Sequence, residues 1–188
     1  MTLAAALRAP VPTSEAMDDL DPHEMPDARP AAVLVGVVDR SDPTLLLTRR
    51  NPAMRTHAGQ VAFPGGRIDA GETPVEAALR EAQEEVALDP ALPRIVGTLD
   101  PYLTGTAFIV TPVLAILPPD LPLVASEAEV DHWFEAPLDL LADPERHVRE
   151  EAVWRGRKRR YWRIDYENYD IWGATAAMIV TLSRRLAA

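Results

Sequence analysis

The sequence contains no cysteine among its 188 residues, which excludes a disulfide framework and any thiolate metal site. It also lacks a long apolar run. The longest, Ala31–Val38, is far shorter than the ~20 residues that span a bilayer, and its β-branched residues are typical of a buried strand. Basic residues are outnumbered, 19 against 29 acidic, so the net charge is −10. That charge disfavours nucleic acid and anionic membranes as partners.

Proline and acidic residues dominate the first part of the chain, where large apolar residues are few. We therefore expect residues 1–29 to form a loosely structured arm with one short helix after Ser14, and residues 30–188 to form one domain. The opening residues lack a basic leader, so we expect a cytoplasmic protein. A homodimer is compatible with the sequence.

Hydrophobic periodicity predicts strands that alternate with two main helices, and hence a mixed sheet covered by helices. A helix is expected over Pro74–Val86, because Thr73 and Glu76 form a capping box and Pro74 suits the first helical position. The remaining predicted elements are strands at Ala31–Val38, Leu45–Thr48, Arg94–Leu99, Phe108–Leu117 and Val130–Glu135, a short helix from Pro137, a hairpin of Ala152–Arg155 and Tyr161–Tyr166, and a final helix over Ala174–Leu186.

Three carboxylates, Glu81, Glu84 and Glu85, share one face of the predicted helix within about one turn. Like charges at this spacing destabilise a helix slightly, whereas a hard divalent cation prefers such oxygen ligands. A solvated acidic face is the alternative reading of these residues alone. The preceding Gly-rich segment Phe63–Gly66 favours a ligand site, since its glycines let the backbone approach a ligand or metal.

The stretch from Gly66 to Leu88 resembles the Nudix box, G-x5-E-x7-R-E-U-x-E-E-x-G-U, where U is a bulky aliphatic residue. It departs at two positions, because Ala82 replaces an aliphatic residue and Ala87 replaces the last glycine. The resemblance implies an α/β protein with the Nudix fold, an α/β/α sandwich with a mixed β-sheet, which hydrolyses a nucleoside diphosphate derivative with Mg²⁺ or Mn²⁺. The matching residues are Gly66, Glu72, Arg80, Glu81, Glu84, Glu85 and Leu88.

The resemblance also implies roles for these residues. Glu81, Glu84 and Glu85 would be metal ligands in the catalytic centre, joined by a carbonyl oxygen of Gly65 or Gly66, while Glu72 and Arg80 would form a structural ion pair. Bound metal ions lower the pKa of a water that attacks phosphorus, so no nucleophilic serine or cysteine is required.

Residues before the box resemble the L-L-T-x-R-[SA]-x3-R-x3-G-x3-F-P-G-G signature of the coenzyme A pyrophosphatase branch. Leu46–Thr48, Arg50, Arg55, Gly59 and Phe63–Gly66 match, whereas Asn51 stands where serine or alanine is usual. Ile171–Ala176 looks like the start of that branch's last helix. This resemblance implies hydrolysis of coenzyme A or acyl-coenzyme A to 4′-phosphopantetheine, or its acyl form, and 3′,5′-ADP.

Arginine suits a phosphorylated substrate because its planar guanidinium pairs with phosphate oxygens. Each candidate has an alternative role as a surface ion pair, and His57 is expected to hydrogen-bond within its loop rather than act as a base. The candidate substrate-binding residues are Arg49, Arg50, Arg55, Gly59, Phe63 and Arg67.

Two further features leave alternatives open. Glu129 begins a stretch that resembles the branch pattern, and is expected either to assist water activation or to be an exposed loop acid. The basic segment Arg155–Arg160 is expected to be a charged hairpin tip, with binding of the 3′-phosphate, the adenine or a nucleic acid as alternatives. Rival functions are another Nudix specificity, such as ADP-ribose or a dinucleotide, and a catalytically silent nucleotide-binding module.

Overall fold

The computed structural model describes residues 27–154 and 156–187. Apart from residues 27–29, the predicted arm and its short helix lie outside the described residues. None of the described helices is long and apolar enough to cross a membrane.

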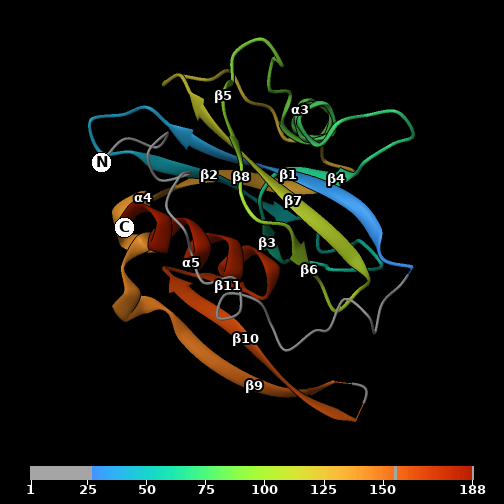
Figure 1. The fold of residues 1–188 in the computed structure, drawn as a ribbon. Helices are drawn as coiled ribbons and strands as arrows, with labels where there is room; N and C mark the ends of the chain where they lie inside the picture. Colours follow the sequence, from blue (N-terminus) through green and yellow to red (C-terminus); the bar gives the residue numbers. More distant parts are fainter. Residues whose placement is uncertain (1–26, 155, 188) are drawn as a thin grey trace.

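The centre of the fold is a mixed eight-stranded sheet (Figure 1). Its main order is β3-β2-β1-β7-β5, with β4 and β8 paired to β1 and β2, and β6 paired to β7. Strands β1 and β7 run parallel, and the other pairs are antiparallel. The strands are β1 (Arg29–Val38), β2 (Thr44–Arg50), β3 (Val61–Ala62), β4 (Gly65–Arg67), β5 (Arg94–Thr98), β6 (Tyr102–Leu103), β7 (Phe108–Leu117) and β8 (Val130–Pro137).

Strand β1 is apolar along most of its length because both faces of the sheet are covered. Val35 and Val37 enter one hydrophobic core, whereas Leu34 and Val38 enter the other. Gly36 lies where strand β7 comes close, since a Cβ there would lie 2.6 Å from a methyl carbon of Leu117. The strand begins at Arg29, two residues before the predicted Ala31.

Helix α3 (Pro74–Val86) covers one face of the sheet, and helix α5 (Ala174–Ala187) covers the other together with α4 (Leu138–Ala142) (Figure 1). This is the expected α/β/α arrangement. The predicted capping box is present, because the Thr73 hydroxyl accepts from the Glu76 N–H and the Glu76 carboxylate accepts from the Thr73 N–H. The helix ends at Ala87, whose φ of 55° is the left-handed conformation that the glycine of the box would adopt at lower cost.

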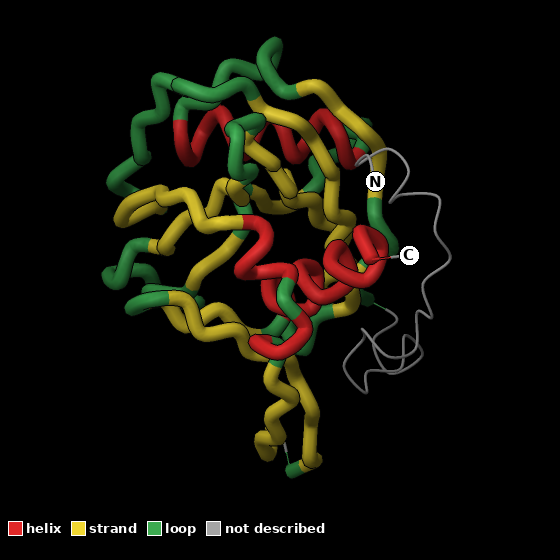
Figure 2. The backbone as a smooth tube through the Cα atoms, turned by 90° about the vertical axis from the view of Figure 1, so that its left-hand side faces the viewer, coloured by secondary structure: helices red, strands yellow, loops and turns green. Residues whose placement is uncertain are grey.

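A second, three-stranded sheet of order β11-β10-β9 packs beside α5. It consists of β9 (Val148–Trp154), β10 (Arg157–Tyr166) and β11 (Tyr169–Trp172), and a short 3-10 helix (Pro144–Arg146) precedes it. The predicted hairpin around Gly156 is present but longer at both strands, and the third strand was not predicted. Figure 2 shows the tip of the β9–β10 hairpin projecting from the rest of the described chain.

Candidate active site

Helix α3 directs Glu85 inwards, towards the first two residues of β4, Gly65 and Gly66, which we call the glycine bend. The side chain is 3% exposed, and its Oε2 accepts a hydrogen bond of 3.2 Å from the Gly65 N–H. Nη1 of Arg50, at the end of β2, lies 3.7 Å from Oε1. Burial raises the pKa of Glu85 to about 7, although Gly65 and Arg50 act in the opposite direction. The Gly65 N–H and the Arg50 guanidinium do not fully offset the cost of burying the charged carboxylate, so the site favours the approach of a further cation.

Glu81 lies one turn earlier, against Gly66. A Cβ at Gly66 would lie 2.5 Å from the carboxylate carbon of Glu81, so any side chain at this position would displace that carboxylate. Burial raises the pKa of Glu81, while the neighbouring Arg80 guanidinium lowers it. The two glycines therefore bring backbone within reach of both Glu81 and Glu85.

Arg80 joins the loop before α3 to the helix. Its guanidinium donates to both carboxylate oxygens of Glu72, at 2.8 and 3.1 Å, and to the Arg67 carbonyl oxygen at 2.9 Å. Its Nη1 also lies 2.9 Å from Glu81 and 3.2 Å from Glu84. The hydrogen bonds from Arg80 lower the pKa of Glu72. Arg80 thus holds the glycine bend at a fixed position beside the carboxylates.

The expected convergence of the three carboxylates is only partly present in the described part of the chain, and their joint binding of a cation stays a prediction. Among the described residues, no three acidic or histidine side chains are grouped closely enough to hold one cation. Glu81 and Glu85 face the glycine bend, whereas the side chain of Glu84 is 56% exposed and turned towards Arg80. The physical reason is mutual repulsion on one helical turn, which the Arg80 guanidinium relieves by lying between Glu81 and Glu84.

The chemistry of this donor set nevertheless fits a hard divalent cation. The available ligands are carboxylate oxygens of Glu81, Glu84 and Glu85 and backbone carbonyl oxygens at Gly65 and Gly66, and such a cation prefers oxygen. Because Gly66 has no side chain, the Glu81 carboxylate can lie close to the backbone there. Binding by all three carboxylates would replace the contacts of Glu81 and Glu84 with Arg80.

Glu129 lies near the same carboxylates although it is distant in sequence. Its side chain is exposed, and its negative charge contributes to the raised pKa of both Glu81 and Glu85. The loop before it is hydrogen-bonded to the end of α3, because the Val124 N–H donates to the Val86 carbonyl and the Ser126 N–H donates to the Glu85 carbonyl. The structure therefore brings the predicted Glu129 to the edge of the carboxylate site.

The adjacent arginines of β2 contact groups on opposite sides of the sheet, at a point where the pairing of β2 with β8 shifts register. Arg50 faces Glu85, and its Nη2 also contacts the Met54 sulfur at 3.2 Å. Nε of Arg50 is buried and has no hydrogen-bond partner among the described residues. Arg49 instead borders a pocket on the other side, with an Asp131 carboxylate oxygen 3.9 Å from its Nη1.

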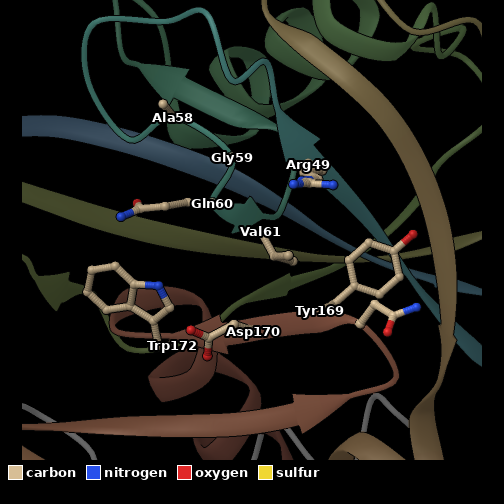
Figure 3. Close-up of a pocket in the computed structure, with 9 residues that line it drawn as sticks. Arg49, Ala58, Gly59, Gln60, Val61, Tyr169, Asp170 and Trp172 are labelled. Carbon is tan, nitrogen blue, oxygen red and sulfur yellow. The ribbon is translucent and has the colours of Figure 1, made fainter.

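This pocket has a volume of about 330 Å³ and lies between the segment before β3 and strand β11. Figure 3 shows Asp170 and Trp172 of β11 on one side of the pocket, with Arg49 of β2 and Gln60 of the loop before β3 on the other side. Trp172 is 42% exposed, so its indole is available for stacking. The full lining is Arg49, Ala58, Gly59, Gln60, Val61, Asn168, Tyr169, Asp170 and Trp172.

The other predicted substrate-binding residues are dispersed. Arg55 is exposed and forms no ion pair within the part of the chain that the structure describes, and Arg67 lies over the Phe108 ring at 5.9 Å. Phe63 is 2% exposed and packs in the hydrophobic core, and its expected substrate contact stays a prediction. His57 hydrogen-bonds Gln60 within its loop at 2.8 Å, as expected.

The aromatic and acidic wall of the pocket, formed by Tyr169, Asp170 and Trp172, was not predicted from the sequence. The sequence pattern at Ile171–Ala176 predicts only the start of the last helix. The pocket depends on contact between β11 and β3, which are far apart in the chain, and no local pattern reports such a contact.

Comparisons with known proteins agree with this geometry. Residues 27–156 match the NUDIX domain family. Proteins of Salmonella newport (strain SL254) and Salmonella paratyphi B, each named "Uncharacterized Nudix hydrolase NudL", are 46% identical over 165 residues, which is 87% of this chain and 86% of theirs.

Solved structures are similar at greater distance. A Nudix hydrolase from M. smegmatis, RenU, is 27% identical with a TM-score of 0.53, and the match covers 62% of this chain and 74% of that one. A MutT/nudix family protein from Enterococcus faecalis has a TM-score of 0.52 and covers 86% of this chain and 62% of that one. At 14% identity the latter supports the fold alone.

Proposed function

Because this chain belongs to the Nudix hydrolase family, we propose that it hydrolyses the diphosphate bond of coenzyme A or acyl-coenzyme A. The family membership makes it an enzyme that cleaves phosphoanhydride bonds in nucleoside diphosphate derivatives, and such enzymes generally use divalent metal ions. The proposed products are 4′-phosphopantetheine, or its acyl form, and 3′,5′-ADP. The proposed ions are Mg²⁺ or Mn²⁺.

The observation that carries the proposal is the meeting of two motifs. Arg50, which matches the coenzyme A signature, lies 3.7 Å from Glu85, which matches the Nudix box. An arginine beside the proposed metal ligands is suitably placed to bind a phosphate group. The buried Nε of Arg50 has no hydrogen-bond partner among the described residues, and this also supports a role for Arg50 in binding a ligand.

The proposed roles follow from this geometry. Glu81, Glu84, Glu85 and a carbonyl oxygen of Gly65 or Gly66 would hold the cation. A bound cation neutralises the diphosphate and lowers the pKa of a bound water. Glu129 would accept the proton of the attacking water, and its exposed carboxylate beside Glu81 and Glu85 supports this role.

Arg50 and the exposed Arg55 would bind phosphate oxygens, and Glu72 with Arg80 would keep the glycine bend in place. We propose that the 330 Å³ pocket receives the adenosine end of the substrate. Trp172 offers an aromatic face for the base, and Arg49 offers a donor for the 3′-phosphate. Gly59, also in the pocket lining, has a φ of +70° that favours glycine.

A substrate panel tests the proposal. We expect coenzyme A and acetyl-coenzyme A to have the highest kcat/KM with Mg²⁺ or Mn²⁺, compared with ADP-ribose and diadenosine tetraphosphate, and no turnover with EDTA. An at least tenfold preference for ADP-ribose or the dinucleotide would contradict the coenzyme A assignment. Tight nucleotide binding without metal-dependent turnover of any substrate would identify a silent module. The proposal includes a cytoplasmic location and allows a homodimer, which light scattering of the purified protein would detect.

A further inference from the structure

We propose that Asn51 is a positioning residue that fixes the loop carrying Glu129 against the arginine end of β2. Asn51 stands where the coenzyme A signature usually has serine or alanine. The inference rests on the proposed function, in which Glu129 accepts a proton at the reaction centre. Asn51 would act through this loop and would not touch the substrate.

Three hydrogen bonds place Asn51 between two loops. Its side-chain Nδ2 donates to the Glu127 carbonyl oxygen at 2.6 Å, and its Oδ1 accepts from the Ala53 N–H at 2.8 Å. Its backbone N–H donates to the Glu129 carbonyl oxygen at 2.9 Å. Side chain and backbone thus hold the same loop on either side of residue 128.

The opposite side of this loop is attached to helix α3. The Ser126 N–H donates to the Glu85 carbonyl oxygen at 2.8 Å, and the Ser126 carbonyl oxygen accepts from the N–H groups of Glu129 and Val130. The loop is therefore held by α3 on one side and by Asn51 on the other. Two attachments restrict the position of Glu129 relative to Glu85 more than one attachment does.

Both side-chain bonds depend on the identity of residue 51, but only the bond to Glu127 is lost with alanine and with serine alike. The backbone N–H donates to Glu129 whatever the side chain, so alanine and serine retain that bond. Serine can also replace Oδ1 as an acceptor for the Ala53 N–H, as short hydroxyl side chains do in turns. Neither residue has an amide donor that extends to the Glu127 carbonyl. This chain therefore carries an attachment that the usual signature residues lack.

Steady-state kinetics of Asn51→Ala and Asn51→Ser test the inference. Losing the bond to Glu127 should lower kcat about three- to tenfold in both variants and leave KM within about twofold of wild type. Wild-type kcat in Asn51→Ser would show that only the turn at Ala53 matters, and a raised KM at constant kcat would indicate substrate contact. Either result would overturn the inference.

Asp143→Ala is the matched control, because Asp143 Oδ1 accepts the Glu145 N–H at 3.0 Å in a comparable local turn preceding β9. Its kcat should stay within about twofold of wild type. A loss equal to that of Asn51→Ala would attribute the effect to general destabilisation and contradict the proposed positioning.

A double-mutant comparison of Asn51→Ala with Glu129→Gln separates positioning of Glu129 from other effects on kcat. In a Glu129→Gln background, Asn51→Ala should lower kcat less than twofold further, because the group that it positions is already disabled. Equal losses in both backgrounds, or no loss in Glu129→Gln alone, would overturn the inference. The assays use whichever panel substrate the wild type cleaves fastest, so a failed coenzyme A assignment leaves this test intact.

Hydrogen exchange supplies a readout that needs no turnover. Asn51→Ala should increase amide exchange in the segment of residues 124–130, and Asp143→Ala should leave it unchanged. Unchanged exchange in Asn51→Ala would show that the side chain does not hold the loop, and would overturn the inference even in a fully active enzyme.

Discussion

Replacement of Glu85 by glutamine should separate the folding role of this position from its proposed metal role. Glutamine has the same shape and can still accept the Gly65 N–H, but it carries no charge. In the metal-free protein, burial raises the Glu85 pKa from its ordinary value of 4.5 to about 7. That rise corresponds to roughly 3 kcal/mol of cost for the ionised side chain in the folded state.

The sign of the stability change follows from this raised pKa. A carboxyl group that titrates higher in the folded state costs stability as the pH rises from about 4.5 through about 7. At pH 8 the metal-free Glu85→Gln protein should therefore be more stable than wild type by about 1–3 kcal/mol. At pH 4.5 most of that difference should disappear. Urea unfolding at both pH values, in the presence of EDTA, measures it.

Catalysis should change in the opposite direction. The variant should lose at least about a hundredfold in kcat and much of the stabilisation that Mn²⁺ gives to wild type. Glu151→Gln is the control for charge removal, since Glu151 is exposed on β9 and lies 3.7 Å from the Lys158 ammonium. Near-normal turnover in Glu85→Gln, or a strongly destabilised metal-free variant at pH 8, would refute the reasoning.

Three further predictions concern the surroundings of the site. Glu72→Gln should weaken the attachment of Arg80 to the glycine bend and lower kcat about tenfold, while circular dichroism remains that of wild type. Ala82→Leu should lower the free energy of unfolding by about 1–3 kcal/mol in urea, since Ala82 is fully buried against the sheet. Glu135→Gln should be less stable than wild type at neutral pH, because hydrogen bonds from Arg40 lower the Glu135 pKa; this deficit should shrink as the pH falls below the ordinary pKa of 4.5, and an unchanged deficit in acid would contradict it.

Local signals account for the elements that were predicted with correct bounds or with bounds within two residues. Helix α3 begins and ends where expected because Thr73, Pro74 and Glu76 act within one turn of its start. The continuous apolar runs of β1 and β7 likewise report burial on both faces. Strand β11 of the three-stranded sheet was not predicted, because it is short and its position depends on pairing with β10.

The candidate site was predictable to the extent that it lies in contiguous motifs. The spacing of Glu81 and Glu85 on one helix face follows from helix geometry, but the ion pair that holds Glu84 beside Arg80 depends on side-chain conformation. Phe63 shows a second limit, since the signature does not indicate that a residue at this position is part of the hydrophobic core. The proximity of Glu129 depends on hydrogen bonds between a distant loop and α3, which no local pattern contains.

The central claim is that carboxylates of α3 beside a glycine bend support metal-dependent cleavage of the coenzyme A diphosphate. Mass spectrometry of coenzyme A hydrolysed in ¹⁸O-labelled water with Mg²⁺ tests it most directly. We expect 4′-phosphopantetheine and 3′,5′-ADP, with one ¹⁸O atom on one of them, and no products with EDTA. Intact coenzyme A, cleavage at another bond, or equal product yield without a divalent ion would contradict the claim.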